Sequence, residues 1–403
     1  MKKNYSFATS GLTFRTLFIL FIFTVSFSAY ALSSNNPVVV KKGERPAIDL
    51  ASVPDAAIEQ GIIRIKFNRT LESVVDNMQL RSNADGSVGI GIPAIDQLNQ
   101  QFGVVSVGKT FSNALEDSRF PDRPRQWGFP LWFELHVPAN TDIRAMVMAY
   151  AGKNEIEVAE PVYRKRLIGA DVNAIRTQSA GGDETGLNYV PNDPRYNEQW
   201  HYHNTGQQSG TVDADIDLPE AWDITKGSSS VIVAVIDEGI SYTHTDLAAN
   251  MWPGNGYNFV TGSSTISPGD HGTHVAGTIA ANTNNGTGVS GIAGGTGSGN
   301  GVRLMSCQVF TSSSSGGFED APIYAADNGA AISQNSWGYT SVGYYEQAVL
   351  DAIDYFNANG GGSVLVDGGI TIFAAGNSDA SGQWYPGCYS GTFSVAATNN
   401  LDM

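Results

Sequence analysis

The sequence predicts an α/β protein, with a mostly parallel sheet that is covered by helices on both faces and is preceded by a small α+β domain. From residue 191 onward, short apolar runs alternate with helical stretches, which is the pattern of a parallel sheet buried on both sides. Upstream, residues 47–168 instead show strands in which apolar and polar residues partly alternate, as expected for half-buried strands.

Length and composition fit this division and exclude some classes of protein. A chain of 403 residues exceeds what one hydrophobic core usually organises, so two or more folding units are expected. Hydrophobic residues make up 41% and charged residues 15%, which indicates a globular chain. The net charge of −16 provides no basic surface for nucleic acid and disfavours anionic membranes. We expect neither partner for the mature protein.

The N-terminus has the parts of a secretory signal peptide. Lys2, Lys3 and Arg15 precede the apolar stretch 17–27, and small residues follow in the Ala-Tyr-Ala of 29–31. A transmembrane anchor is the alternative, but the stretch is shorter than the ~20 apolar residues that span a bilayer. Residues 1–31 are therefore predicted to direct secretion to the extracellular space.

Residues 32–168 are predicted to form the small α+β domain. Strands are expected at 62–67 and 131–137, helices at 94–99 and 142–150, and a last strand over 155–168 that turns at Glu160-Pro161. Residues 169–190 are polar, rich in Gly, Ser, Thr and Asp, and have no periodicity. This composition indicates a linker and a processing region.

The second unit, 191–403, contains the elements of the parallel sheet. Strands are expected at 231–237, 302–310, 330–336, 370–375 and 392–397, and helices at 271–281, 320–328 and 344–359. The last helix should bury one face, made of Val349, Leu350, Ile353 and Phe356, and should end at Gly360. In such sheets functional residues gather at the carboxyl ends of strands, where Asp237, 335–338 and 376–377 fall.

Two cysteines give no disulfide framework. Cys307 lies in an apolar run and Cys388 in a Pro-Gly turn. We expect the first to be buried as a small apolar residue, the second to lie at the surface, and no bond between them.

A candidate for acid–base chemistry follows the first strand. The sequence Val-Ile-Asp237-Glu-Gly ends that strand, and Asp-His271-Gly-Thr-His274 begins the next helix. A buried strand-end aspartate that faces a histidine on the first turn of a helix can orient the imidazole as a general base. A zinc pair is the alternative, but a zinc helix has His-Glu-x-x-His. We assign the base to His271 and a structural role behind the helix to His274.

These motifs, together with Ala374-Ala-Gly-Asn377, make residues 192–398 resemble the subtilisin-like serine peptidases, the subtilase family. Residues 47–168 are similar, more weakly, to the family's inhibitory propeptide. The resemblance implies a secreted zymogen that hydrolyses polypeptides through an acyl-enzyme. It also implies that the chain's own propeptide acts as an intramolecular inhibitor and chaperone.

The resemblance also implies roles for individual residues. Asp237 would accept a hydrogen bond from the imidazole of His271, and Asn377 would donate to the oxyanion of the tetrahedral intermediate. Alternatives are a solvated strand-end carboxylate for Asp237 and a left-handed turn residue for Asn377. Two segments resemble the strands that hold an extended substrate by backbone hydrogen bonds, namely Ser336-Trp337-Gly338 and Gly316-Gly317. Trp337 would form a large wall of that site.

A calcium site is a further implication of the resemblance. The loop 281–289 is similar to the family's cation loop, and its ligands would be backbone oxygens of Thr283, Thr287 and Val289, the side chain of Asn285 and the carboxylate of Asp246. A plain Gly/Asn surface loop is the alternative. Asn285-Gly-Thr287 also matches a glycan acceptor. A glycan there would prevent ligation by Asn285.

A nucleophilic serine is not evident in this chain. Ser394 lies in Gly-Thr-Phe-Ser-Val-Ala, whose β-branched and apolar setting predicts a strand. We therefore expect the nucleophile downstream of Met403 and, without it, no acyl-enzyme. A catalytically silent, subtilase-like binding or adhesion module is the alternative function. A nucleotide-binding protein is disfavoured because no Gly-x-Gly-x-x-Gly turn follows a strand.

Overall fold

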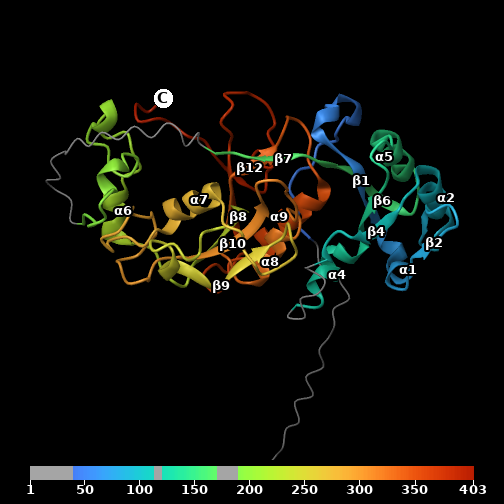
Figure 1. Ribbon diagram of the computed structural model, residues 1–403, viewed down its shortest axis with the longest axis horizontal. Coiled ribbons are helices and arrows are strands. Elements are labelled where there is room, and N and C mark those ends of the chain that lie inside the picture. Colours follow the sequence, from blue (N-terminus) through green and yellow to red (C-terminus); the bar gives the residue numbers. More distant parts are fainter. Residues whose placement is uncertain (1–39, 113–119, 170–188) are drawn as a thin grey trace, which may run out of the picture. The chain divides into compact units, whose positions relative to one another are not determined.

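A six-stranded sheet organises the C-terminal half of the computed structural model, which describes residues 40–112, 120–169 and 189–403. Its order is β14-β13-β11-β8-β10-β9, and each of these neighbouring pairs is parallel. The strands are β8 (Ile232–Glu238), β9 (Met251–Asn258), β10 (Arg303–Phe310), β11 (Ile332–Asn335), β13 (Ile370–Ala374) and β14 (Phe393–Val395). The predicted α/β fold is thus confirmed (Figure 1).

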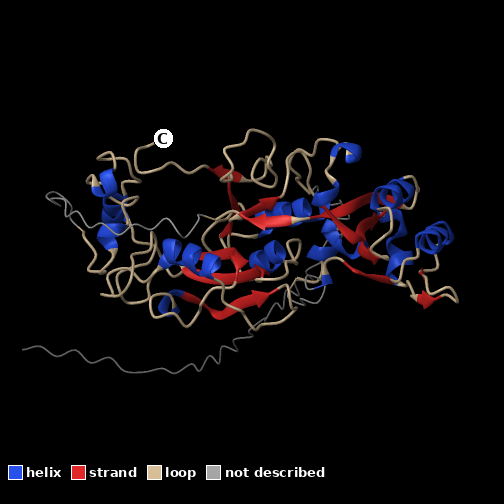
Figure 2. Ribbon diagram, turned by 45° about the horizontal axis from the view of Figure 1, so that its top comes forward, coloured by secondary structure: helices blue, strands red, loops and turns tan. Residues whose placement is uncertain are grey.

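Helices cover both faces of this sheet (Figure 2). Along β8, Val233 and Val235 belong to the core that includes helix α7 (Asp270–Ala280), whereas Ala234 and Ile236 belong to the core that includes α8 (Ala321–Asp327) and α9 (Gln347–Asn359). Because successive side chains of a strand point to opposite faces, the apolar run of β8 fills two cores at once. Helix α6 (Leu218–Ile224) lies outside these layers and packs in a small aromatic cluster.

Helix α9 departs from its predicted form in two respects. It begins at Gln347, three residues later than expected, and it ends before Gly360 as predicted. Its side chains are buried without interruption from Ala348 to Phe356, so the prediction of a single apolar face was wrong. The reason is that α9 contacts α8 and β13 on its inner side, while side chains from the N-terminal half of the chain contact it as well.

The N-terminal half contains a four-stranded sheet of order β4-β5-β1-β6, in which each neighbouring pair is antiparallel. Its strands are β1 (Ile58–Phe67), β4 (Ser106–Lys109), β5 (Trp132–His136) and β6 (Ile156–Tyr163). The other elements are α1 (Glu72–Asp76), β2 (Arg81–Ser82), β3 (Val88–Gly89), α2 (Pro93–Phe102), α4 (Arg123–Trp127) and α5 (Ile143–Ala151). Helix α5 contacts β1 and β6 and begins at the N-cap Asp142.

The predicted turn at Glu160-Pro161 was wrong. Both residues lie inside β6, where Arg64 pairs with Glu160 and Ile63 with Pro161. Strand β6 is at the edge of its sheet, and an edge strand tolerates a proline because the missing N–H faces away from the ladder. After β6, the short strand β7 (Lys165–Leu167) leaves this sheet and pairs instead with β12 (Trp337–Tyr339) of the C-terminal half.

Some elements had no readable sequence signal. Strand β9 contains a proline and two glycines, which lower β-propensity, and the sequence analysis missed both β9 and α6.

Both cysteines are free, Cys307 buried in β10 and Cys388 exposed, as predicted. The predicted signal peptide 1–31 and most of the predicted linker, 170–188, lie outside the described residues. No helix in the described segments has the length and apolar character to cross a membrane.

Candidate active site

Asp237 and His271 meet at the carboxyl end of β8. Asp237 is the next-to-last residue of the strand and is fully buried, and His271 is the second residue of α7. The imidazole Nδ1 lies 2.6 Å from Asp237 Oδ1, and the same oxygen accepts a hydrogen bond from the backbone N–H of Glu238. With Nδ1–H donating to the carboxylate, Nε2 is left free to accept a proton.

The electrostatics of this pair follow from burial and contact. Burial raises the pKa of Asp237, and the hydrogen bond from His271 opposes that rise. The same hydrogen bond raises the pKa of His271, while partial burial lowers it. A carboxylate that stabilises the imidazolium in this way makes the histidine a stronger base than a free imidazole.

Close contact between β8 and α7 fixes the position of His271. The backbone N–H of His271 donates to the Glu238 carboxylate at 3.0 Å. A Cβ at Gly272 would collide with the backbone oxygen of Glu238, so only glycine allows the helix to approach the strand this closely. Glu238 therefore has a positioning role that the sequence alone did not suggest.

The segment 165–169 of the N-terminal half occupies the region in front of His271. Strand β7 pairs antiparallel with β12, with Arg166 opposite Gly338 and Leu167 opposite Trp337. The pairing continues beyond β7, because the N–H of Ile168 donates to Ser336 O at 2.7 Å. An extended peptide added to a strand edge is a common mode of peptide recognition.

The carbonyl groups at the end of this segment point to the candidate catalytic residues. His271 Nε2 lies 3.3 Å from Ile168 O, and Asn377 Nδ2 donates to Gly169 O at 2.7 Å. A Cβ on Gly169 would collide with the His271 ring. Asn377 follows β13 and is exposed, so its amide is available to a peptide carbonyl.

A cavity of about 530 Å³ lies beside this segment. Ile168, Gly338, Ala374, Ala375, Gly376 and Trp384 are among the residues that line it. The small side chains at 374–376 leave room for a residue at the position of Ile168, whose Cδ1 is near Gly338. The geometry is that of a peptide-binding groove with a side-chain pocket.

The other predicted substrate-binding residues lie differently. The Trp337 ring is 1% exposed and packs between Phe318 and Phe373 at centroid distances of 4.7 and 5.1 Å. The ring therefore belongs to the core and does not form the large wall that was predicted, whereas the backbone of Trp337 pairs with Leu167 of segment 165–169. Between the described residues, no backbone hydrogen bond joins Gly316 or Gly317 to segment 165–169.

Two other residues were weighed for chemistry. His274 is exposed, so the expectation that it packs behind the helix was wrong; its neighbour is His201, whose pKa burial lowers to about 4, with His274 adding to the effect. Ser394 lies in β14 and is paired with β13, as its sequence predicted. Within 40–112, 120–169 and 189–403, no serine hydroxyl forms a hydrogen bond with His271 Nε2.

The predicted calcium residues lie in one loop around Asp246. Asp246 is 2% exposed, and its two oxygens accept from Asn285 Nδ2 at 2.8 Å and from the N–H of Val289 at 3.0 Å. Burial raises the pKa of Asp246, and no lysine or arginine of the described segments forms an ion pair with it. Thr283 is buried and Thr287 N–H donates to Asn285 Oδ1. Both oxygens of Asp246 thus accept hydrogen bonds, and the described residues contain no group of three or more His, Cys, Asp or Glu side chains that could hold a metal ion.

A cluster of buried charges joins the two halves and was not suggested by the sequence. Arg64 of β1, 4% exposed, contacts the carboxylates of Glu134, Glu319 and Glu346 at 2.9, 3.0 and 2.6 Å. Although burial opposes it, these carboxylates raise the pKa of Arg64. Lys165 contacts Glu346 at 2.6 Å as well. In the sequence, Arg64 looks like an ordinary solvated arginine. Its burial in β1 became evident only from the structure.

Glu160 is another buried acidic residue of the N-terminal half, and it contacts the start of α9. Its carboxylate accepts from the N–H groups of Gln347 at 2.6 Å and Ala348 at 3.1 Å, which caps the first turn of the helix. Burial and the nearby Glu346 raise the pKa of Glu160 to about 8. The N-terminal half thus contacts α9 through buried polar groups.

Comparisons with known proteins place these observations in a family. Residues 228–402 match the model of the subtilase family, peptidase S8. Thermitase from Thermoactinomyces vulgaris is 36% identical over 218 residues, which are 53% of this chain and 67% of thermitase. A thermophilic serine proteinase from Bacillus sp. (strain AK1) is 35% identical, and the chain spans 47% of its length. The structure of fervidolysin from Fervidobacterium pennivorans matches 87% of this chain and 44% of that protein, with a TM-score of 0.50 and 22% identity.

Proposed function

This chain belongs to the subtilase family of serine proteases, and on that premise we propose that it comes from a secreted endopeptidase made as a zymogen. In this proposal residues 1–31 direct export and residues 32–168, the prosegment, fold with the peptidase domain and inhibit it. Residues 191–403 supply the groove and the acid–base pair. The substrates are polypeptides, which are cleaved through an acyl-enzyme with water as the final acceptor.

The proposed chemistry assigns one task to each residue of the site. His271 Nε2 takes the proton of the attacking serine hydroxyl and later gives it to the leaving amine. Asp237 holds the ring through Nδ1 at 2.6 Å and stabilises the imidazolium that forms. Asn377 donates its amide to the oxyanion, a contact worth about 3 kcal/mol of activation free energy.

The single observation that carries the proposal is the position of segment 165–169. A peptide from the N-terminal half lies antiparallel on β12, with one carbonyl at His271 and the next at Asn377. A substrate would likewise have to lie extended on β12, with its backbone beside these two residues. The same segment blocks the groove, which is how an attached prosegment would inhibit.

We propose that self-processing cuts the Ile168–Gly169 bond. The N–H of Ile168 donates to Ser336 O, and the carbonyl oxygen of Ile168 lies beside His271 Nε2. A cut after Gly169 is the alternative favoured by the hydrogen bond from Asn377.

The N-terminus of the mature protein tests this proposal. The gene product is expressed with its natural C-terminus, and the secreted form is sequenced from its N-terminus. Gly169 is the expected first residue, and Ala170 would support the alternative cut. A mature N-terminus before 165 or after 190 would contradict the role of segment 165–169. Absence of casein hydrolysis by the processed protein would instead favour a silent binding module.

We also propose that the Asp246 loop binds calcium in a structural role. Asp246 and backbone oxygens of Thr283, Thr287 and Val289 would hold the ion. Asn285 now directs its nitrogen to Asp246, so ligation requires its amide to turn by about 180° and present the oxygen. Asp246 would then exchange a neutral donor for a cation, which relieves the cost of its burial.

Removal of calcium is therefore expected to lower the melting temperature of the mature domain. At calcium concentrations about one hundred times Kd, binding adds about 2.7 kcal/mol, or roughly 5–10 °C for a domain of this size. Calorimetry with and without a chelator measures the shift. Asp246→Asn should abolish the response to calcium, whereas Asp367→Asn, at an exposed position, should keep it. An equal melting temperature in both conditions for the natural sequence would reject the site.

A further inference from the structure

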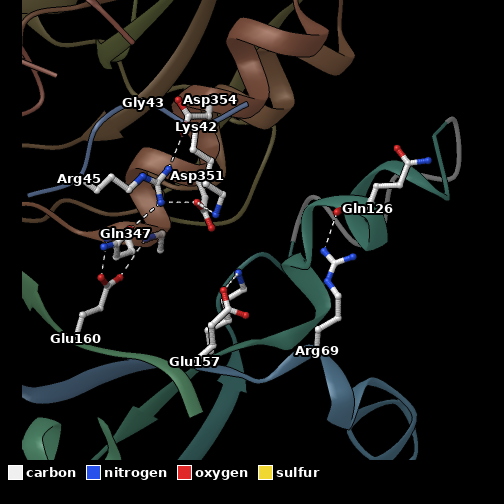
Figure 3. A network of polar contacts seen from close by, with 12 residues as sticks. Lys42, Gly43, Arg45, Arg69, Gln126, Glu157, Glu160, Gln347, Asp351 and Asp354 are labelled. Atoms are coloured by element: carbon white, nitrogen blue, oxygen red, sulfur yellow. Dashed lines mark hydrogen bonds and ion pairs between the residues drawn. The ribbon is translucent and has the colours of Figure 1, made fainter. Parts of the chain in front are cut away.

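Residues 40–46, upstream of the N-terminal sheet, contact the C-terminal half directly. Their contacts are with α9, with Tyr345 just before it and with residues 385–390, and Figure 3 shows the two basic side chains, Lys42 and Arg45, beside that helix. Lys42 Nζ lies 2.6 Å from Asp351 Oδ1. Arg45 contacts Asp351 Oδ1 and Asp354 Oδ2, each at 2.6 Å, with different nitrogens of its guanidinium. The two aspartates are one helical turn apart, a spacing that matches the fork of an arginine.

The backbone of the same segment is held as well as its side chains. Gly43 N–H donates to the Tyr389 hydroxyl and Glu44 N–H to Ser390 Oγ, each at 2.8 Å. Tyr345 donates its hydroxyl to Pro46 O at 2.6 Å. A Cβ at Gly43 would lie 2.5 Å from the ring of Tyr389, so this position accepts only glycine without movement of the ring. The contact therefore depends on the identity of three residues, Lys42, Gly43 and Arg45.

The acidic side of this contact is buried and depends on the cations. Asp351 is 1% exposed and Asp354 is 4% exposed. Burial alone would raise the pKa of Asp351, but Arg45 and Lys42 lower it below its usual value. One oxygen of Asp351, Oδ2, is buried and has no hydrogen-bond donor in the described part of the chain. A buried carboxylate of this kind is costly once its cations leave.

We propose that Asp351, Asp354 and Tyr389 form an exosite for a Lys-Gly-x-Arg segment, and that residues 42–45 of this chain are its ligand. The exosite gives the prosegment an anchor in addition to β7, the ion pairs of Arg64 and the contact of Glu160 with α9. It rests on the proposed zymogen function for its biological use, although the binding itself needs no catalysis. Once the link near Gly169 is cut, several anchors on one folded ligand raise the effective concentration of each, so the prosegment remains bound longer than any one contact allows.

The test measures how fast a cut prosegment dissociates. The full gene product carries His271→Ala, so that it cannot process itself, and a recognition sequence for an unrelated protease is inserted within 170–188. After cleavage at that sequence, the C-terminal part is immobilised and the release of the prosegment is followed by surface plasmon resonance. Arg45→Gln is expected to raise the dissociation rate about 30-fold or more, because it leaves two buried carboxylates without their main cation.

Two controls separate this anchor from general charge or folding effects. Lys41→Gln removes the same charge from an exposed residue of the same segment, and it should leave the rate within about twofold, as expected for a surface charge. Arg45→Lys keeps the charge and should lie between the natural sequence and Arg45→Gln. Adding Asp354→Asn to Arg45→Gln should increase the rate less than it does in the natural sequence, since the two residues share one contact.

The exosite is rejected if Arg45→Gln and Lys41→Gln dissociate at the same rate, or if the natural prosegment leaves at once after cleavage. Neither outcome depends on peptidase activity, because His271→Ala is present throughout. A failure of the proposed peptidase function would appear only in the casein assay and at the mature N-terminus. The two proposals can therefore fail separately.

Discussion

Replacing His271 with alanine in the full gene product is expected to lower kcat by about six orders of magnitude, as for the base of a Ser-His-Asp triad, and to stop self-processing. Among the described residues, the histidine is the one side chain that joins Asp237 to the bound segment, with Nδ1 2.6 Å from the carboxylate and Nε2 3.3 Å from Ile168 O. Without it, no group takes the proton of the nucleophile. Hydrolysis of a peptide anilide and the size of the secreted protein measure the two effects.

The matched control is His274→Ala. His274 lies three residues later on the same helix and is exposed, so its loss should leave kcat within about threefold, given its lack of contact with the reacting groups. If His271→Ala still processes itself, the assignment of the general base is wrong. If both variants lose activity together, the helix rather than the base would account for the loss.

Replacing Arg64 with methionine should destabilise the uncut protein by about 3–5 kcal/mol, the cost of breaking a buried ion pair from one side. Arg64 is 4% exposed and contacts three carboxylates, two of them from the C-terminal half. Burial already raises the pKa of Glu319, and Arg64 opposes that rise. Without the guanidinium, these carboxylates must take up protons or admit water.

Denaturant unfolding in the His271→Ala background measures this effect while the prosegment remains attached. Arg69→Met is the control, because Arg69 is exposed and donates to the Gln126 carbonyl; a change below about 1 kcal/mol is expected there. Adding Glu319→Gln to Arg64→Met should restore part of the stability, because Arg64 is the only ion-pair partner of Glu319 among the described residues. A loss below about 1 kcal/mol for Arg64→Met would mean that solvent already reaches the cluster.

The sequence predicted those features of the fold that depend on local patterns. The five apolar runs all became strands. Strands β8 and β10 are almost wholly buried, whereas β14 is exposed and forms through its pairing with β13. Helix α7 begins beside its histidine as expected. Strand β9 was missed because its pairing with β10 outweighs its proline and glycines. Pairing with a strand distant in the sequence leaves no local pattern from which β9 could be predicted.

The candidate site shows the same limit. The position of Asp237 at a strand end and of His271 at a helix start indicated their contact before any distance was known. The partners of Arg64 and Arg45 could not be predicted, because they come from segments hundreds of residues away. The burial of α9 on every side has the same origin, since Arg45 and Glu160 reach it from the N-terminal half.

Because these contacts join residues far apart in the sequence, they can form only late in the synthesis of the chain. Gly43 and Tyr389 are 346 residues apart, so at about 5–20 residues per second the ribosome needs roughly 20–70 s to make the second partner after the first. Between the synthesis of Glu134 and that of Glu319, Glu134 is the only one of the three carboxylates in contact with Arg64 that is already present, and it belongs to the same small sheet. Glu134 thus serves the nascent chain as a provisional counter-ion, until Glu319 and Glu346 have been synthesised and can replace water around the guanidinium.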